Sequence, residues 1–208
     1  MVGDCMRIIE YSHRHCDAII RSNPLFLQRY EEFMGALRSI TDEELIEDFN
    51  ARKLAHTSLK SITPGLNHIL KERMDTIPGW ENEVFIFNDT LGLVNNTEWR
   101  LDFACETFSV EVAFNHGEAI AWNLLKPTLA SELNHVEKAI QTQLGIYVCA
   151  TDNMKRQANI DGASGSFEKV MRYLPAMMNQ LTIPMMIIGL DGFDTFKIDK
   201  STKSIVMI

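Results

Sequence analysis

Residues 100–116, RLDFACETFSVEVAFNH, carry acidic residues inside short apolar runs of the kind that form buried strands. Alternate residues of a strand share a face, so Glu111 and Ala113 point to the side opposite the large apolar residues beside them. If the chain reverses at residues 106–107, Asp102 lies opposite Glu111 in an antiparallel pair, with Cβ atoms about 4.5–5.5 Å apart. Two carboxylates at that separation repel each other.

A divalent cation between the two carboxylates removes this repulsion, because Mg²⁺ takes carboxylate oxygen, water and phosphate oxygen as ligands. A metal ion held in this way can polarise a phosphodiester and generate hydroxide from bound water. The alternative is that Asp102 and Glu111 are two solvent-facing charges on an edge strand. The spacing alone does not distinguish these two interpretations.

The first third of the chain has helical patterns. SNPLFLQRYEEFMGALRSI places Pro24 in a first turn, and TDEELIEDF begins with Thr41 and Glu44 at the spacing of a capping box. TPGLNHILKERMDTIPGW has Pro64 near its start and is stopped at Pro78. Three helices are therefore predicted before the acidic segment.

The rest of the chain alternates strand and helix patterns. VFIF, RLDFA, FSVEVAF, LGIYVCA and IPMMIIGL predict strands. Helices are predicted at 118–138, interrupted near Pro127, and at 166–182, where Pro175 kinks or ends the helix. This order predicts an α/β fold with a mixed central β-sheet flanked by helices, antiparallel around 100–115 and parallel towards IPMMIIGL. The tail DGFDTFKIDKSTKSIVMI is expected to add an edge strand or a dimer contact.

Composition indicates one globular domain over residues 1–208, since 46% of residues are hydrophobic, 23% are charged and no linker or repeat divides the chain. The net charge of −8 counts against a general nucleic-acid coat protein, because phosphate binding uses clustered Lys and Arg. It does not exclude a nuclease, whose metal ligands are themselves acidic.

Cysteine usage and hydropathy indicate the compartment. The four cysteines form no CxxC pair, which argues against a zinc or disulfide framework and fits a reducing cytosol. The longest apolar run, PMMIIGL, is too short to span a bilayer, and the N-terminus lacks a signal-peptide pattern. We therefore expect a soluble, cytoplasmic protein with no membrane partner.

Asp102, eight intervening residues and the run VEVAFNH resemble the active-site hairpin of the BglII/BstYI family of type II restriction endonucleases. These enzymes are related to BamHI and have the PD-(D/E)xK nuclease fold. MRIIEYSH looks like the family's N-terminal strand, and TPGLNHILKERMDTIPGW is similar to its helix that ends in a tryptophan. DGASGSFEKV lies where the family has a serine-rich recognition loop. Together these stretches cover nearly the whole chain, so the resemblance implies a restriction-endonuclease-like fold.

The resemblance implies that Asp102 and Glu111 hold Mg²⁺, with Mn²⁺ able to substitute, and that Glu83 is a further ligand or water anchor. For Glu83 the alternative is a solvated charge, and Glu81, Asn82 and Asp89 are equally placed.

The third motif position is Gln, Glu or Lys in relatives and orients or activates the attacking water, but here it is Ala113. A methyl group can neither accept a proton nor hold a water. Either another group takes this role, with Asn115 and Glu118 the nearest polar candidates, or the chain binds metal and DNA and cuts poorly.

The resemblance also places the base-reading residues on the loop NIDGASGS. Ser164, Gly165 and Ser166 are the candidates there, although Ser166 could equally be the N-cap of the following helix. His116, five residues after the glutamate, corresponds to a contact with the outer base pair, and Asn115 lies beside it. For His116 the alternative is an exposed turn histidine.

Lys155 and Arg156 precede this loop and are candidate phosphate contacts, or an ordinary solvated charge pair. Relatives imply a palindromic double-stranded DNA site with a GATC centre, such as RGATCY or AGATCT. A palindrome has a two-fold axis, so a homodimer with one site per strand is expected. Family analogy adds a cognate DNA methyltransferase.

Three hypotheses follow from the sequence. The first is a Mg²⁺-dependent, dimeric type II restriction endonuclease, in which Ala113 impairs activity or is compensated. The second is a catalytically inactive homologue that binds the same DNA. The third is a metal-dependent phosphohydrolase that acts on a small nucleotide.

Overall fold

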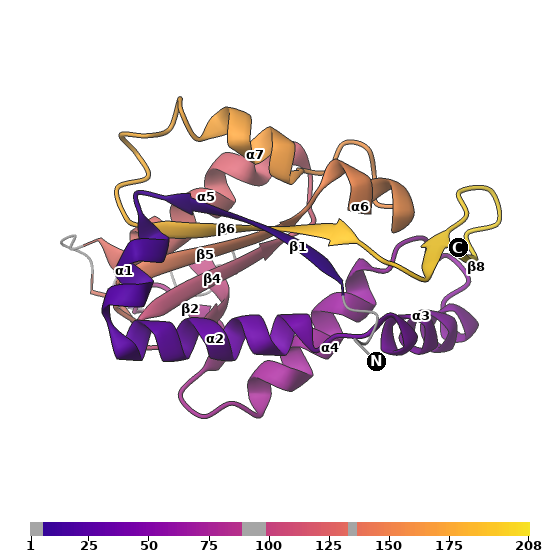
Figure 1. Ribbon diagram of the computed structural model, residues 1–208, viewed down its shortest axis with the longest axis horizontal. Coiled ribbons are helices and arrows are strands. Elements are labelled where there is room, and N and C mark those ends of the chain that lie inside the picture. The colour runs from indigo at the N-terminus through magenta and orange to yellow at the C-terminus, as the bar shows by residue number, and fades with distance from the viewer. Residues whose placement is uncertain (1–5, 89–98, 133–136) are drawn as a thin grey trace.

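The computed structural model of the protein describes residues 6–88, 99–132 and 137–208. Its centre is a six-stranded sheet with the order β1-β6-β5-β4-β3-β2 (Figure 1). The strands are β1 (Arg7–His13), β2 (Glu81–Phe85), β3 (Arg100–Ala104), β4 (Phe108–Ala113), β5 (Leu144–Ala150) and β6 (Met185–Gly192). β4, β5 and β6 run parallel, whereas the β1–β6, β2–β3 and β3–β4 pairs are antiparallel. The prediction of a mixed sheet is confirmed.

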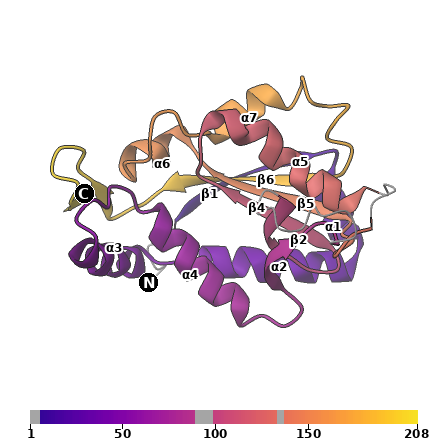
Figure 2. The same cartoon turned by 180° about the vertical axis from the view of Figure 1, so that it is seen from behind.

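Helices cover both faces of this sheet (Figures 1 and 2). One layer contains α1 (Cys16–Ser22), α2 (Pro24–Arg38), α3 (Asp42–Ala55) and α4 (Thr63–Asp75). The other face carries α5 (Ile120–Ser131) and α7 (Phe167–Tyr173), and α6 (Asp152–Gln157) follows β5. Every residue of β5 is buried, as expected of a parallel strand with helices on both sides.

The helix starts follow the local sequence. The Asn23 side chain accepts a hydrogen bond from the backbone N–H of Leu25, so Asn23 rather than Ser22 caps α2. Thr41 and Glu44 form a complete capping box at the start of α3. These caps satisfy backbone donors that the first helical turn leaves free.

The prediction for α5 is wrong in two respects. α5 ends at Ser131, not at 138, and it continues through Pro127, where an interruption was expected. Pro127 is buried against Gly145 of β5, where an added Cβ would lie only 3.0 Å from the proline Cβ. This packing compensates for the hydrogen bond that a proline removes from a helix. α7 ends at Tyr173, two residues before Pro175, which confirms the expectation that this proline ends the helix, although Leu174 itself keeps helical dihedral angles.

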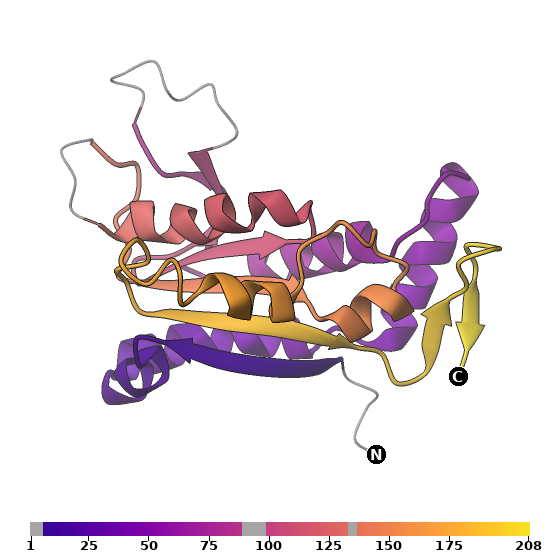
Figure 3. The same ribbon diagram turned by 90° about the horizontal axis from the view of Figure 1, so that it is seen from above.

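The C-terminal tail pairs with itself and does not extend the main sheet. β7 (Phe196–Ile198) and β8 (Ile205–Met207) form a separate two-stranded sheet, which lies beyond the end of the six-stranded sheet (Figure 3). Of the two alternatives for the tail, the added edge strand is therefore wrong, and the dimer contact stays a prediction. In the part of the chain that the structure describes, no helix has the length and hydropathy needed to cross a membrane.

Candidate active site

The β3–β4 hairpin places the two acidic residues opposite each other. Phe103 pairs with Val110 in this antiparallel ladder. Continuing the register by one residue on each strand sets Asp102 opposite Glu111. The reversal between the strands falls at residues 105–107, as the sequence predicts.

A third acidic residue continues the row on the neighbouring strand. Asn82 of β2 pairs with Phe103, and the same register places Glu83 opposite Asp102. Glu83 has a positive φ of 53°, which non-glycine residues seldom adopt. Its carboxylate forms ion pairs with Lys71 of α4 at 3.4 Å and with Arg100 of β3 at 3.3 Å.

Glu111 is a buried carboxylate with an incomplete set of partners. Only 4% of the residue is exposed, and its Oε1 accepts a hydrogen bond of 2.7 Å from Nζ of Lys126 in α5. Its Oε2 is buried and has no partner among the described residues. Burial raises the pKa of Glu111 to about 8; the charge of Asp102 adds to this rise, and Lys126 opposes it. A buried polar atom without a partner is costly, so this oxygen is available to a ligand.

Asp102 is held by the backbone of the opposite strand. Its Oδ2 accepts a hydrogen bond of 2.6 Å from the N–H of Val112. Burial raises the pKa of Asp102, while the Val112 hydrogen bond and the nearby Lys126 and Arg100 act against the rise. The raised pKa values of Asp102 and Glu111 have a common cause, since both carboxylates are withdrawn from water and lie close together.

A cavity of about 140 Å³ opens beside Asp102. It lies between the sheet and α4 and is lined by Asn67, Leu70, Lys71, Glu83, Asp102, Phe103 and Val112. Asn67 and Lys71 are four residues apart, so they share one face of α4. The sequence interpretation missed both residues, because α4 carries several other polar and charged side chains and its pattern does not single these two out.

The site fits a hard divalent cation. Asp102 and Glu111 supply carboxylate oxygens, and the unpartnered Oε2 of Glu111 has no other role in the described chain. Among the residues that the structure describes, no group of three or more His, Cys, Asp or Glu side chains could hold a metal ion. Mg²⁺ is usually bound by one or two carboxylates together with water and phosphate oxygens, so a pair of carboxylates matches its needs.

Ala113 faces the same side as Glu111 and is packed in apolar surroundings. The residue is 3% exposed and belongs to a cluster with Ile120 and Leu124 of α5. In the described chain no hydrogen bond joins Asn115 or Glu118 to either carboxylate, and Asn115 Oδ1 accepts one from Asn123 instead.

The polar side chain that contacts Glu111 is Lys126, which the sequence interpretation missed. The sequence feature that could have indicated Lys126 is its position as the single charged residue in the largely apolar run AWNLLKPTLA.

The two segments with candidate base-reading residues lie side by side. His116 and Ser164 form an isolated antiparallel bridge, and the N–H of Gly165 donates to the carbonyl of Asn115 at 3.0 Å. These segments follow β4 and β5, whose parallel carboxyl ends meet at one edge of the sheet. Asn115 and His116 are exposed, whereas Ser164 is largely buried.

Ser166 has the capping role that was left open as an alternative. It is 3% exposed, and its Oγ accepts a hydrogen bond from the N–H of Lys169 at the start of α7. The side chain therefore has a structural partner.

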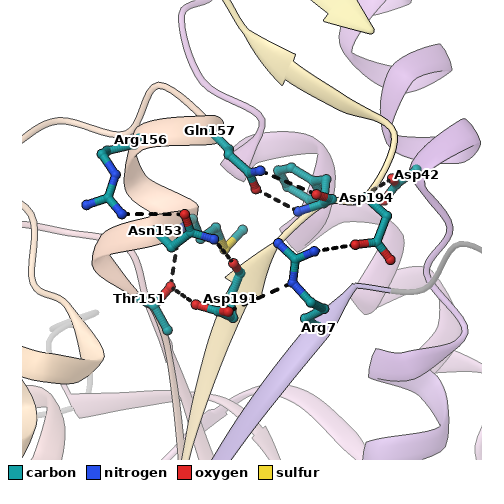
Figure 4. Close-up of polar contacts among 10 residues, drawn as sticks. Arg7, Asp42, Thr151, Asn153, Arg156, Gln157, Asp191 and Asp194 are labelled. Atoms are coloured by element: carbon teal, nitrogen blue, oxygen red, sulfur yellow. Dashed lines mark hydrogen bonds and ion pairs between the residues drawn. The ribbon is translucent and has the colours of Figure 1, made fainter. Parts of the chain in front are cut away.

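The two basic residues before the loop differ in their contacts. Lys155 Nζ donates to the carbonyl oxygens of Gly162 at 3.0 Å and Ser164 at 2.6 Å, so it braces the loop. Arg156 is exposed, and the one hydrogen bond of its side chain in the described chain is a 3.4 Å contact with Asn153 (Figure 4).

Comparison with known proteins gives one consistent result. Residues 8–190 match the protein family described as "Restriction endonuclease BglII/BglIII". A solved structure of the restriction endonuclease BglII complexed with a DNA 16-mer is similar, with a TM-score of 0.62 and 19% identity over 97% of this chain and 89% of that chain. Free BglII is similar with a TM-score of 0.55 and 18% identity over 97% and 90% of the two chains. The search of curated proteins gives no match.

Proposed function

The chain belongs to the restriction endonuclease BglII/BglIII family, and from this premise we propose that it is a Mg²⁺-dependent type II enzyme that cuts a palindromic DNA site with a GATC centre. The family supports site-specific cleavage of DNA. The metal, the site sequence and the residues that carry the reaction are parts of the proposal.

The observation that carries the proposal is the buried pair Asp102 and Glu111, with Oε2 of Glu111 left unpartnered. The Val112 N–H holds Asp102, and Lys126 holds Glu111, so both carboxylates are oriented before any ligand arrives. A divalent cation held by these oxygens supplies Lewis acidity and lowers the pKa of a bound water. Asn67, which lines the adjoining cavity, and Glu83, in the same row of strands, are candidates for anchoring that water.

The proposed reaction is hydrolysis. The oxygen of a water attacks phosphorus in line, the bond from phosphorus to the 3′ oxygen breaks, and the products are a 5′-phosphate and a 3′-hydroxyl. The attacking water gives up a proton to solvent, and the 3′ oxygen leaves with a proton taken from solvent. Asp102 and Glu111 serve this step by fixing the positions of the charges around the scissile phosphate.

Asn115, His116 and Ser164 are the proposed base-reading residues. Amide, imidazole and hydroxyl groups all donate or accept hydrogen bonds at base edges, which is how sequence is read in the major groove. His116 and Ser164 belong to segments joined by a bridge, so the two segments approach DNA as one surface. Arg156 is the proposed phosphate contact, with Gly165, Ser166 and Lys155 shaping the loop behind the reading surface.

A palindromic substrate also requires a homodimer, in which each subunit places one cleavage site on one strand. A DNA methyltransferase that protects the same sequence is the expected partner system.

The test is digestion of a sequenced plasmid with Mg²⁺ or Mn²⁺, followed by mapping of the ends. The proposal expects cuts only at sites with a GATC centre, carrying 5′-phosphates, and no cuts by an Asp102→Asn control. Cleavage without sequence preference, or full cleavage in excess chelator, would overturn it.

Ala113 favours a second candidate, a homologue that binds this DNA without cutting it. The methyl group is packed against apolar residues and supplies no polar contact. This candidate expects salt-sensitive binding of a GATC duplex, no cleavage with either metal, and no gain from Ala113→Gln.

A further inference from the structure

The proposed cleavage site contains a lysine that the hairpin motif does not include. Lys126 comes from α5, and its ammonium group lies 2.7 Å from Oε1 of Glu111. Both side chains are nearly withdrawn from solvent, with 12% and 6% of their surface exposed. Lys126 also lies close enough to Asp102 for its charge to act on that carboxylate.

Stability of the fold does not account for the buried pair of Lys126 and Glu111 as a whole. Lys126 is the one charged residue of α5, whose neighbouring Leu124 is buried in an apolar cluster. A buried ion pair seldom adds net stability over apolar side chains of similar size, because removing two charges from water is costly. A lysine placed in such a helix therefore points to a role for its charge.

The contact is also selective between the two oxygens of Glu111. Lys126 occupies Oε1, while Oε2 is buried and has no partner in the described chain. The lysine thus limits the rotation of the carboxylate and determines which oxygen stays available. Ala113, on the same face of β4, offers no polar atom that could do this.

We propose that Lys126 is a positioning residue for DNA cleavage: it holds Oε1 of Glu111 and presents Oε2 to the divalent cation, beside a third motif position where Ala113 offers no polar group. This inference rests on the proposed function. Lys126, which comes from α5 and not from the hairpin, thereby compensates for the missing polar group at Ala113.

The rival explanation is that Lys126 is only a counter-ion, which a divalent cation displaces. The two explanations differ in where the ammonium lies when the cation is bound. They also differ in what its removal does to cleavage.

The first experiment measures single-turnover cleavage of a GATC duplex by wild type, Lys126→Met and a control, Lys53→Met, whose lysine lies in α3. Loss of a group that orients a metal ligand typically costs about 10–100-fold in activity, so Lys126→Met is expected to lose about that much. Lys53→Met is expected to match wild type. Duplex affinity in Ca²⁺ and circular dichroism confirm that the variants are folded and bind DNA.

The second experiment does not depend on activity and covers the case in which Lys126→Met fails to fold. Crystals of the wild-type protein are soaked with Mn²⁺, and the metal is located by anomalous scattering. The proposal expects Mn²⁺ at Oε2 with the ammonium still hydrogen-bonded to Oε1. Mn²⁺ at the carboxylates with the ammonium withdrawn would overturn it.

The outcomes distinguish the role of Lys126 from the proposed cleavage of DNA. If wild type cuts the duplex and Lys126→Met cuts equally fast, the positioning role is wrong and the nuclease assignment stands. If wild type does not cut with Mg²⁺ or Mn²⁺, the proposed function fails, and the Mn²⁺ structure still decides whether Lys126 orients Glu111.

Discussion

Two regions of the molecule gather carboxylates, and they differ in what satisfies the oxygens. At the hairpin, Glu111 receives one hydrogen bond, from Lys126, and Asp102 receives one, from the Val112 N–H. At the end of β6, Asp42 Oδ2 alone accepts three, from the N–H of Asp194 at 3.1 Å and from the N–H and hydroxyl of Thr195 at 2.9 and 2.7 Å.

The second region, here called the β6-end cluster, comprises Arg7, Asp42, Asp191 and Asp194 (Figure 4). Arg7 of β1 forms ion pairs with Asp191 and Asp194, and the Thr151 hydroxyl donates to Asp191 at 2.8 Å. The contacts join β1, α3, the end of β6 and the residues that directly follow β5 and β6.

Asp42 Oδ1 is also buried without a partner in the described residues, but the three donors on Oδ2 tie that carboxylate into the fold. Carboxylates that hold the fold together are satisfied by protein donors. At the hairpin, Oε2 of Glu111 is buried without a partner in the described chain, and both carboxylates have raised pKa values.

The largest expected effect is on cleavage. Asp102→Asn and Glu111→Gln each remove a charge proposed to hold the metal ion, which supplies several kcal/mol of transition-state stabilisation. Each variant is expected to lose about 10³-fold in single-turnover rate. Asp191→Asn, the same chemical change in the β6-end cluster, is the control and should cut within about threefold of wild type. Equal losses of cleavage rate in all three variants would contradict the proposal that the hairpin carboxylates, and not the β6-end cluster, act in cleavage.

The second expected effect is on stability, where a substitution in the β6-end cluster should cost more than one at the hairpin. Asp42→Ala leaves the three donors without an acceptor, and buried unsatisfied groups cost about 1–3 kcal/mol each before relaxation and water entry. We expect a loss of about 2–4 kcal/mol in the free energy of unfolding, measured by urea denaturation. Glu111→Gln is the comparison and should not lower the free energy of unfolding near neutral pH, because a buried amide needs no proton to be neutral. A larger loss from Glu111→Gln than from Asp42→Ala would contradict the assignment of the two regions.

The third effect is a pH dependence of the metal-free protein. The folded-state pKa of Glu111 is about 8, above its ordinary value of 4.5, so between these values the folded state binds more protons than the unfolded state. The stabilisation is full below the lower value and is lost as pH rises through the upper one. Wild type should lose stability relative to Glu111→Gln by ~1 kcal/mol per pH unit across this window. Parallel pH profiles of the two proteins, from thermal unfolding in chelator, would contradict this.

The smallest effect concerns the exposed edge of the β6-end cluster. Arg7 is 46% exposed at its side chain, and its ion pairs with Asp191 and Asp194 are screened by water and salt. Arg7→Gln is expected to cost less than about 1 kcal/mol, and the difference from wild type should shrink in high salt. A loss as large as that of Asp42→Ala would mean that the charges, rather than the buried hydrogen bonds, hold this cluster together.

Sequence patterns predicted the parts of the fold that depend on local chemistry. The Thr41–Glu44 capping box and the proline at the start of α2 mark helix starts, because the groups that satisfy the first turn are adjacent in sequence. The alternation in FSVEVAF gave the faces of β4 and the opposition of Asp102 and Glu111. The end of α5 and its continuity through Pro127 were predicted wrongly, since the packing of Pro127 against Gly145 involves distant segments, whereas Pro175 correctly indicated where α7 ends.

The sequence by itself determined the family, the mixed sheet and the two acidic residues of the hairpin, because these depend on residue type and spacing along the chain. Only the tertiary structure decided that Lys126 contacts Glu111, that Asn67 lines the cavity beside Asp102, and that His116 meets Ser164. Those pairs lie on different elements, and their contacts arise when helices pack on the sheet and parallel strands end at one edge. Burial, which raises the pKa of Glu111 and leaves Oε2 without a partner, likewise exists only in the packed molecule.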